Sequence, residues 1–411
     1  MKLKYEFPNS PKLKRLNLAV ETKRDKLTFK VKGPSAFFYR QFFRIYFIAH
    51  SKLKPVATYN GGNVYTLYIP PIPSKAHNRL FENFVRRWLY KTRIPLAVTI
   101  AVTDKCQCDC QHCSVPYYSK TEPILTLKEL QKVIKQCLDL GLTNITFTGG
   151  EPLMRKDLEE CLKIVPKEKA VTLVFTNAIG LTKERALSLK NAGAFGVQIS
   201  LDSPIPEEHD RMRNKKGTFL SVERGVKNAL DAGLMVGLST YANNEVVSHE
   251  NLQKIAELAE KWGVHEVTIF DAMPTGQLLK HQEQILTPEA RKQLLKQSKQ
   301  LRKKYRGKIH IISQSWTNSK SGFARFIGCL AGNYQFHISA YGDVRPCDFT
   351  PVSFGNIRNE SVQTLWHKLT NHSEYHKHSN RCRMQSPEFK KRVIDPLAQQ
   401  CGGCLKAEDV W

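Results

Sequence analysis

The chain has 411 residues, which is enough for one large α/β domain with smaller additions. Its 41% hydrophobic and 24% charged residues are typical of a soluble globular protein. The longest apolar run, residues 42–49, contains Arg44 and is far shorter than the ~18 residues of a membrane-spanning helix.

The first eight residues lack the apolar core of a signal peptide, so we expect a cytoplasmic protein. Its eleven cysteines are then expected to be metal ligands and free thiols, because disulfides do not persist in a reducing cytosol. Most of them fall into two groups, at residues 106–113 and at residues 329–404.

Positive charge is concentrated in the first quarter of the chain. Residues 1–97 contain 20 Lys and Arg against 4 Asp and Glu, a net charge of +16 out of +26. The residue pattern there predicts two strands and two helices, at 27–31, 64–69, 35–50 and 78–91. We therefore expect a small, basic, aromatic-rich α+β unit over residues 1–95.

The predicted helix 35–50 has two interpretations. It aligns Arg40 and Arg44 on a narrow stripe beside a broad aromatic face, which suits an interfacial helix on an anionic membrane. The alternative is an ordinary core helix whose aromatic side chains pack on the barrel. Peripheral contact with a membrane stays open, and no recognition motif predicts a specific nucleic-acid partner.

From about residue 96 strands alternate with helices. A glycine follows each of the four clearest helices, as expected of helix C-caps. Six such units predict a parallel sheet curved into a partial (β/α)6 TIM-like barrel, whose site lies at the carboxyl ends of the strands. The predicted strands are 96–103, 144–148, 170–176, 196–201, 235–241 and 266–270, and the helices are 127–140, 183–192, 219–232 and 251–262.

The residues with the most informative chemistry follow these strands. Three cysteines, Cys106, Cys110 and Cys113, come after the first strand, and the sequence Thr-Gly-Gly-Glu-Pro at 148–152 comes after the second. The third strand ends in Thr-Asn at 176–177 and the fourth in Ser-Leu-Asp at 200–202. One ligand in the barrel mouth could contact all four segments.

Three thiolates from one short loop can hold three irons of a 4Fe-4S cluster. The fourth iron is then open to a small molecule, which distinguishes a reactive cluster from an electron carrier. A zinc knuckle is the alternative, but zinc requires four tetrahedral ligands and does not account for the Gly-Gly-Glu segment.

The spacing Cys106-x3-Cys110-x2-Cys113, followed by residues 148–152, resembles the radical S-adenosylmethionine (radical SAM) enzymes over roughly residues 96–315. This resemblance implies that the open iron binds S-adenosyl-L-methionine (SAM). The reduced cluster then cleaves SAM to a 5'-deoxyadenosyl radical, which abstracts hydrogen from an organic substrate. It also implies a reducing electron donor such as flavodoxin or ferredoxin.

The resemblance suggests roles for individual residues. Gly149 and Gly150 would let the backbone approach the ligand, and Glu151 would accept from the SAM amino group. The remaining assignments are His112 for adenine packing, Ser200 and Asp202 for the ribose hydroxyls, and Arg213 for the SAM carboxylate, with Arg211 as its competitor. Cys108 is expected to point away from the cluster, although a one-residue shift in which cysteine is the ligand stays open.

The last hundred residues hold a second group of cysteines. Cys329 and Cys347 flank Gly342, whose turn can bring them together. This pattern resembles the SPASM or twitch extension of radical SAM enzymes, which implies an auxiliary iron–sulfur domain over residues 325–411. Five cysteines are present where a full SPASM extension needs seven, so we expect one auxiliary 4Fe-4S cluster. Its expected ligands are Cys329, Cys347, Cys401 and Cys404, with Cys382 as a substitute ligand or a free thiol.

Structural zinc at this second group is the alternative. Enzymes with such an extension mostly resemble peptide and protein modifiers, so the expected substrate is a peptide or protein, with a small molecule as another option. A lipid or isoprenoid substrate at a membrane surface and a non-catalytic iron–sulfur or zinc protein stay open.

Overall fold

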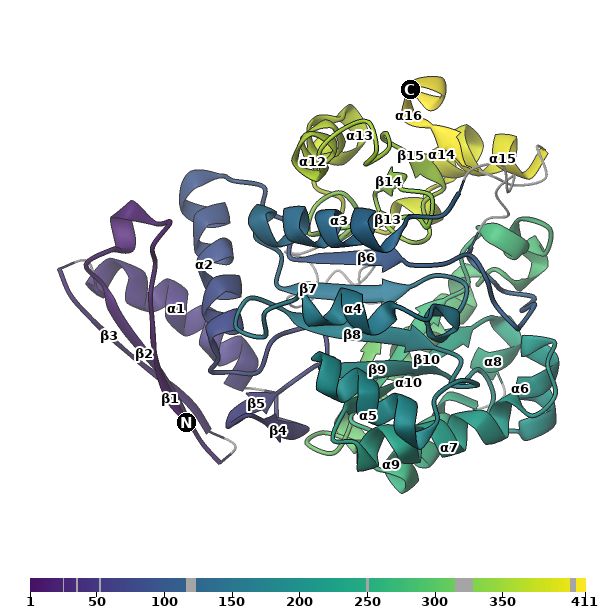
Figure 1. Cartoon of the computed structure of the whole chain (residues 1–411), viewed down its shortest axis with the longest axis horizontal. Helices are drawn as coiled ribbons and strands as arrows, with labels where there is room; N and C mark the ends of the chain where they lie inside the picture. The colour runs from purple at the N-terminus through teal and green to yellow at the C-terminus, as the bar shows by residue number, and fades with distance from the viewer. Residues whose placement is uncertain are drawn as a thin grey trace.

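The computed structural model describes residues 1–24, 26–34, 36–51, 53–115, 123–248, 251–314, 328–399 and 404–411. Its largest sheet has nine strands in the order β12-β11-β10-β9-β8-β7-β6-β13-β14 (Figure 1). All adjacent pairs are parallel except β13 and β14. The six predicted strands are confirmed as β6 (Ala97–Ala101), β7 (Asn144–Thr148), β8 (Val171–Thr176), β9 (Gly196–Ser200), β10 (Met235–Ala242) and β11 (Glu266–Asp271), and β12 (His310–Ser313) was not predicted.

Helices pack on the sheet through one large hydrophobic core. The first of them, α3, begins with a capping box in which Thr126 and Glu129 bind each other's backbone N–H. It ends at Gly141, whose φ of 112° suits a residue without a Cβ. The helices of this region are α3 (Leu127–Leu140), α4 (Leu158–Lys163), α5 (Lys183–Ala192), α6 (Pro206–Arg213), α7 (Thr218–Asp231), α8 (Asn244–Ser248), α9 (Asn251–Trp262) and α10 (Pro288–Lys304).

The N-terminal segment forms an antiparallel three-stranded sheet, a short hairpin and two helices with a core of their own. The aromatic side chains of α1 at Phe43 and Phe47 are buried in that core, whereas Phe37, Phe38 and Ile45 are exposed. The helix therefore packs on its own unit through one face only. The elements are β1 (Lys2–Tyr5), β2 (Asn17–Lys23), β3 (Lys26–Lys32), α1 (Ala36–Ser51), β4 (Ala57–Tyr59), β5 (Gly62–Val64) and α2 (Lys75–Tyr90).

The predicted strand at residues 64–69 is wrong, because β5 ends at Val64 and the chain then turns. The turn is fixed by the buried Glu266 at the start of β11, whose Oε2 accepts from Thr66 Oγ1 at 2.6 Å and from Leu67 N at 3.1 Å. Val64 and Leu67 also pack on the first residues of β8 and β10. The N-terminal unit thus covers the amino end of the barrel, opposite the arrowheads of the strands (Figure 1).

We expect Thr66→Val to loosen this attachment. The substitution removes a hydrogen bond to a buried carboxylate, which should lower the free energy of unfolding by about 2 kcal/mol. Denaturant unfolding, with hydrogen exchange of residues 53–75, measures the effect. Thr28→Val is the control, because the Thr28 hydroxyl makes an exposed bond to Glu21 O. If both substitutions leave the free energy of unfolding nearly unchanged, the hydrogen bond from Thr66 to Glu266 does not hold the attachment.

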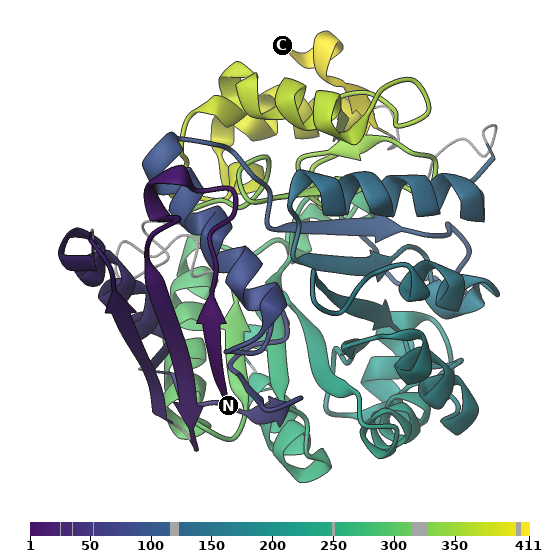
Figure 2. The ribbon, with the colours of Figure 1, turned by 60° about the vertical axis from the view of Figure 1, so that its left-hand side comes forward.

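The C-terminal segment continues the barrel sheet. Its hairpin of β13 (Gln335–Ile338) and β14 (Val344–Arg345) turns at Gly342, where φ is 95°, and β13 pairs with β6. Figure 2 shows this yellow-green part of the chain on the same side as α3. The predicted boundary between residues 315 and 325 lies outside the described residues. The other elements are β15 (Val352–Ser353), α12 (Val362–Asn371), α13 (Ser373–His376), α14 (Pro387–Phe389), a π-helical turn (Lys390–Ile394), α15 (Asp395–Gln399), β16 (Leu405–Lys406) and α16 (Ala407–Val410).

Across the described ranges, none of the helices combines the length and the apolar character needed to cross a bilayer.

Candidate active site

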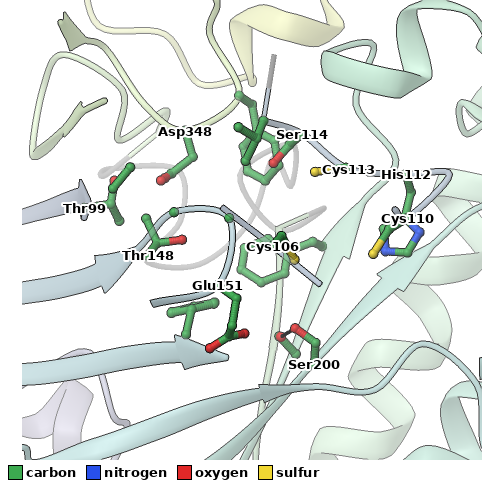
Figure 3. A pocket seen from close by; sticks show the side chains of 18 of the residues that line it. Thr99, Cys106, Cys110, His112, Cys113, Ser114, Thr148, Glu151, Ser200 and Asp348 are labelled. Carbon is green, nitrogen blue, oxygen red and sulfur yellow. Dashed lines mark hydrogen bonds between the residues drawn. The ribbon is translucent and has the colours of Figure 1, made fainter. Parts of the chain in front are cut away.

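A cavity of about 300 Å³ opens at the carboxyl ends of the barrel strands. Figure 3 shows Cys106, Cys110 and Cys113 at this cavity, with Thr99 and Asp348 on the other side of the view from Cys110. All ten residues predicted for the first cluster and its ligand line it: Cys106, Cys110, His112, Cys113, Gly149, Gly150, Glu151, Ser200, Asp202 and Arg213. Of the two arginine candidates, Arg213 lines the cavity and Arg211 is exposed on α6.

The two glycines after β7 hold the cysteine loop. A Cβ at Gly149 would lie 2.3 Å from Thr103 O, and a Cβ at Gly150 would lie 2.3 Å from Lys105 O. The backbone N–H groups of Gly150 and Glu151 donate to the same two carbonyls, at 2.8 and 2.7 Å. Because glycine has no side chain, Gly149 and Gly150 can lie in close contact with the start of the cysteine loop. The sequence pattern did not predict this role.

The other end of the cysteine loop is held by Gly276, which sequence reasoning missed. A Cβ there would lie 2.1 Å from Cys113 O, and φ is 56°. The next residue, Gln277, donates its backbone N–H to the same carbonyl at 2.9 Å. The loop is thus fixed at both ends by backbone contacts that only glycine permits.

The expectation that Cys108 points away from the site of the cluster is wrong. Cys108 lines the cavity with Cys106 and Cys110, whereas Gln107 and Asp109 between them do not. Hydrogen bonding by the Cys108 thiol lowers the pKa of both Cys106 and Cys110, and the Arg213 guanidinium lowers that of Cys110 further. Burial raises the pKa of Cys113 to about 11.

Glu151 is nearly fully buried and is held by its own chain. Its Oε1 accepts from Thr176 Oγ1 at 2.7 Å and from Leu153 N at 3.0 Å, and its Oε2 accepts from Asn177 N at 2.7 Å. Burial raises the pKa of this carboxyl group, and the three hydrogen bonds oppose that shift. The carboxylate therefore ties the end of β7 to the end of β8.

Asp202 is the centre of a charged cluster beside the cysteines. Its Oδ2 lies 2.6 Å from Arg213 Nη2 and 3.2 Å from His112 Nε2, and its backbone N–H donates to His209 Nδ1. Burial alone would raise the pKa of Asp202, but Arg213 and His112 hold it well below its usual value. The His112 ring stacks on Tyr241, with 4.5 Å between centroids.

The C-terminal segment supplies the far wall of the cavity, which sequence reasoning did not anticipate. His337 Nδ1 lies 3.0 Å from Asp348 Oδ1 and 3.0 Å from Thr99 Oγ1. Tyr341 OH donates to Asp104 Oδ2 at 2.8 Å, and this bond joins the β13–β14 hairpin to the start of the cysteine loop. Asp348 directly follows Cys347, so one short segment faces both cysteine groups.

In the second group, Cys329 and Cys347 are buried, and Cys382 is hydrogen-bonded to Cys329. That bond lowers the pKa of Cys329 to about 6. Cys404 interacts with the buried Arg345, which is also close to Cys347. Cys401 lies outside the described residues.

The donor chemistry at the first site fits an iron–sulfur cluster. Across the described residues, no three cysteine, histidine or acidic side chains converge to form a metal centre by themselves. However, four thiols of one loop open into one cavity, and N–H donors of Arg213 and Asn177 face the sulfur atoms. Soft thiolates with such neighbours are the ligands that iron–sulfur clusters use.

Comparisons with known proteins agree with this chemistry. Residues 100–245 match the family model of the radical SAM superfamily, and residues 329–405 match the SPASM model, an iron-sulfur cluster-binding domain. The AdoMet-dependent heme synthase of Nitratidesulfovibrio vulgaris is 27% identical over 325 residues, covering 74% of this chain and 85% of the relative. The subtilosin biosynthesis protein AlbA of Bacillus subtilis is 26% identical, covering 76% and 67%.

Further matches include the PqqA peptide cyclase of Rhizobium meliloti, 25% identical and covering 68% of this chain and 76% of the relative. Streptococcus suis SuiB, solved with its precursor peptide SuiA, shares the fold with a TM-score of 0.57 and 13% identity, covering 88% and 86%. From the motifs, the cavity and these matches together, we conclude that the chain is an enzyme of the radical SAM superfamily with a SPASM iron–sulfur domain, and that its cofactors are a 4Fe-4S cluster and SAM.

Proposed function

We propose that this enzyme oxidises a peptide or protein substrate in the cavity between the cysteine loop and the C-terminal hairpin. The observation that carries the proposal is that one cavity joins the thiols of residues 106–113 to a wall built by His337, Asp348 and Tyr341. Relatives named for bacteriocin biosynthesis and for peptide cyclisation support a peptide substrate. In this proposal residues 1–95, 96–315 and 325–411 are the N-terminal unit, the radical SAM core and the SPASM domain.

We assign Cys106, Cys110 and Cys113 as ligands of the first cluster. When bound, the cluster and SAM supply a 5'-deoxyadenosyl radical that removes a hydrogen atom from the substrate. Gly149, Gly150 and Glu151 fix the loop that carries these thiols. The carboxylate of Glu151 already accepts three hydrogen bonds from its own chain, which supports a positioning role and leaves one acceptor site on Oε2 for the SAM amino group.

We assign the SAM pocket to the charged cluster next to the cysteines. The ion pair with Asp202 fixes the orientation of the Arg213 guanidinium. Its remaining N–H groups are suited to bind the SAM carboxylate. His112 keeps one ring face on Tyr241, which leaves its other face for adenine packing. Ser200 lines the same wall, within reach of ribose hydroxyls.

We assign the auxiliary 4Fe-4S cluster to the second cysteine group. Cys329, Cys347 and Cys404 are the proposed ligands among the described residues, and Cys401 remains a proposed ligand from the sequence. The bond between Cys382 and Cys329 supports Cys382 as a substitute for one of these four ligands instead of a free thiol. Iron and zinc analysis of the purified protein distinguishes a cluster from structural zinc, and zinc at this group would overturn the assignment.

The substrate experiment uses anaerobically reconstituted protein, a reductant such as flavodoxin or ferredoxin, SAM, and a peptide encoded beside this chain's gene. We expect the peptide to change mass only when SAM is present. The outcome that contradicts the proposal is SAM cleavage with conversion of a haem precursor and no change in any peptide, since a heme synthase is also a relative.

We also propose that the N-terminal unit contacts anionic membrane. Phe37 and Phe38 are 83% and 78% exposed on α1, beside Arg40 and Arg44, and this helix contains no acidic residue. Aromatic rings flanked by cations suit the interface of an anionic bilayer. Because the unit covers the amino end of the barrel, this contact would lie opposite the cavity mouth, which argues against a lipid substrate.

Vesicle co-sedimentation tests the contact. We expect the full chain to bind vesicles rich in phosphatidylserine, and Phe37→Ser with Phe38→Ser to weaken binding about 10-fold or more. Leu187→Ser is the control, because Leu187 is 52% exposed on the barrel. The proposal is wrong if the Phe37→Ser, Phe38→Ser variant binds vesicles as well as Leu187→Ser does. It is also wrong if the original protein does not bind them at moderate salt.

A further inference from the structure

Asn177 is buried at the end of β8, between the thiols and Glu151. Its backbone N–H donates to Glu151 Oε2 at 2.7 Å, which fixes the main chain. Its side-chain Oδ1 accepts from Ile179 N at 3.0 Å, which fixes the amide. With the oxygen engaged by a backbone donor, the Nδ2 atom must occupy the other position of the amide group.

That Nδ2 atom faces two sulfur atoms of the cysteine loop. It lies 3.8 Å from Cys106 Sγ and 3.6 Å from Cys108 Sγ. Both sulfurs and the amide line the same cavity. Asn177 therefore carries a neutral N–H donor that two hydrogen bonds hold against the thiols and that cannot titrate.

From this geometry we infer that Asn177 is a positioning residue of the radical-generating site, whose amide N–H donates to a cluster thiolate and raises the cluster's reduction potential. Hydrogen bonds to cluster sulfurs tune the potential, because they stabilise the more negatively charged reduced state. The inference rests on the proposed ligand assignment of Cys106, and it adds a donor that the family motif residues do not include.

The link to Glu151 gives this donor a second consequence. Glu151 binds the end of β8 through Thr176 and Asn177 and is itself held next to the cysteine loop. The Gly-Gly-Glu segment therefore holds the amide and the start of the cysteine loop together, which keeps the donor facing the thiols.

The test compares the first cluster in the original protein, in Asn177→Leu and in Asn177→Asp. A redox titration followed by electron paramagnetic resonance measures the potential, and iron and sulfide analysis measures cluster content. We expect a more negative potential in Asn177→Leu, which lacks the donor. The shift should be larger in Asn177→Asp, which lacks the donor and adds a negative charge. Asn243→Asp is the matched control, since Asn243 is a buried asparagine after β10 whose Oδ1 also accepts a backbone N–H.

Pulsed electron paramagnetic resonance supplies a direct signature. The reduced cluster of the original protein should show coupling to the nitrogen of 15N-labelled asparagine, and this signal should vanish in Asn177→Leu. Coupling to exchangeable protons should only weaken, because Arg213 also donates an N–H to Cys110 Sγ. Full cluster content with an unchanged potential in Asn177→Leu would overturn the inference. If that variant does not fold, an unchanged potential in Asn177→Asp does so instead. A complete absence of iron and sulfide at Cys106–Cys113 in the original protein would instead refute the proposed function.

Discussion

Replacing Cys110 by alanine should abolish SAM cleavage. Loss of groups that only orient metal ligands typically costs 10- to 100-fold in metal affinity or activity, so loss of a ligand should exceed about 100-fold. Cys110 is also the buried thiol that contacts Arg213, at 3.7 Å from Nη1. The measurement is 5'-deoxyadenosine formed per iron–sulfur cluster under reducing, oxygen-free conditions.

Cys137→Ala is the matched control for this experiment. Cys137 is fully buried in α3, in the hydrophobic core and away from the cavity. Its substitution should reduce the free energy of unfolding by about 1 kcal/mol and leave the cleavage rate unchanged. Similar activity of the two variants would show that Cys110 does not hold the cluster.

Asp202→Asn should lower the free energy of unfolding more than Thr66→Val or Cys137→Ala does. Asp202 is buried, and its charge is matched by Arg213 and His112. Removing one partner of a buried ion pair leaves the other charge uncompensated, which costs about 3 kcal/mol or more. Chemical denaturation of the protein without bound SAM measures this loss, and SAM binding should weaken in parallel.

The effect of Asp202→Asn should also depend on pH. The folded protein holds the pKa of Asp202 below its unfolded value, so this carboxylate adds stability above about pH 4 and loses that contribution as the pH falls further. The difference in the free energy of unfolding between the variant and the original protein should therefore reach its maximum by pH 7 and should shrink in acid. Asp231→Asn is the control, since it breaks only an exposed pair with Lys227 worth about 0.5 kcal/mol. A difference that grows in acid would contradict this account.

The barrel was predictable because its elements carry local signals. Each strand is a short apolar run, and the helices that precede Gly141, Gly193, Gly233 and Gly263 end at glycines with positive φ. The helices α3, α5 and α9 begin and end at the predicted residues. These signals depend only on neighbouring residues, so tertiary structure was not needed to recognise them.

The errors arose where distant segments meet. Residues 64–69 alternate like a strand, but the carboxylate of Glu266, some 200 residues away, binds them as a turn. The pairing of β13 with β6 likewise joins the end of the chain to the first barrel strand. Neither partner could be found from local periodicity.

The residues of the site were predictable where they lie in short motifs. The cysteines, Glu151 and Asp202 follow strands in short motifs, so their gathering in one cavity was expected. The role of Gly149 and Gly150 was not, because it depends on the carbonyls of Thr103 and Lys105. The donor on Asn177 and the wall of His337, Asp348 and Tyr341 likewise arise from packing between segments that the sequence does not pair.

We propose that the cysteine loop at residues 106–113 holds the cluster that cleaves SAM. The most direct measurement is the yield of 5'-deoxyadenosine and methionine from SAM, using reconstituted, reduced protein with Cys110→Ala as the blank. We expect SAM-dependent formation of both products by the original protein and none above background by the variant. No 5'-deoxyadenosine from a sample with full iron and sulfide content would contradict it.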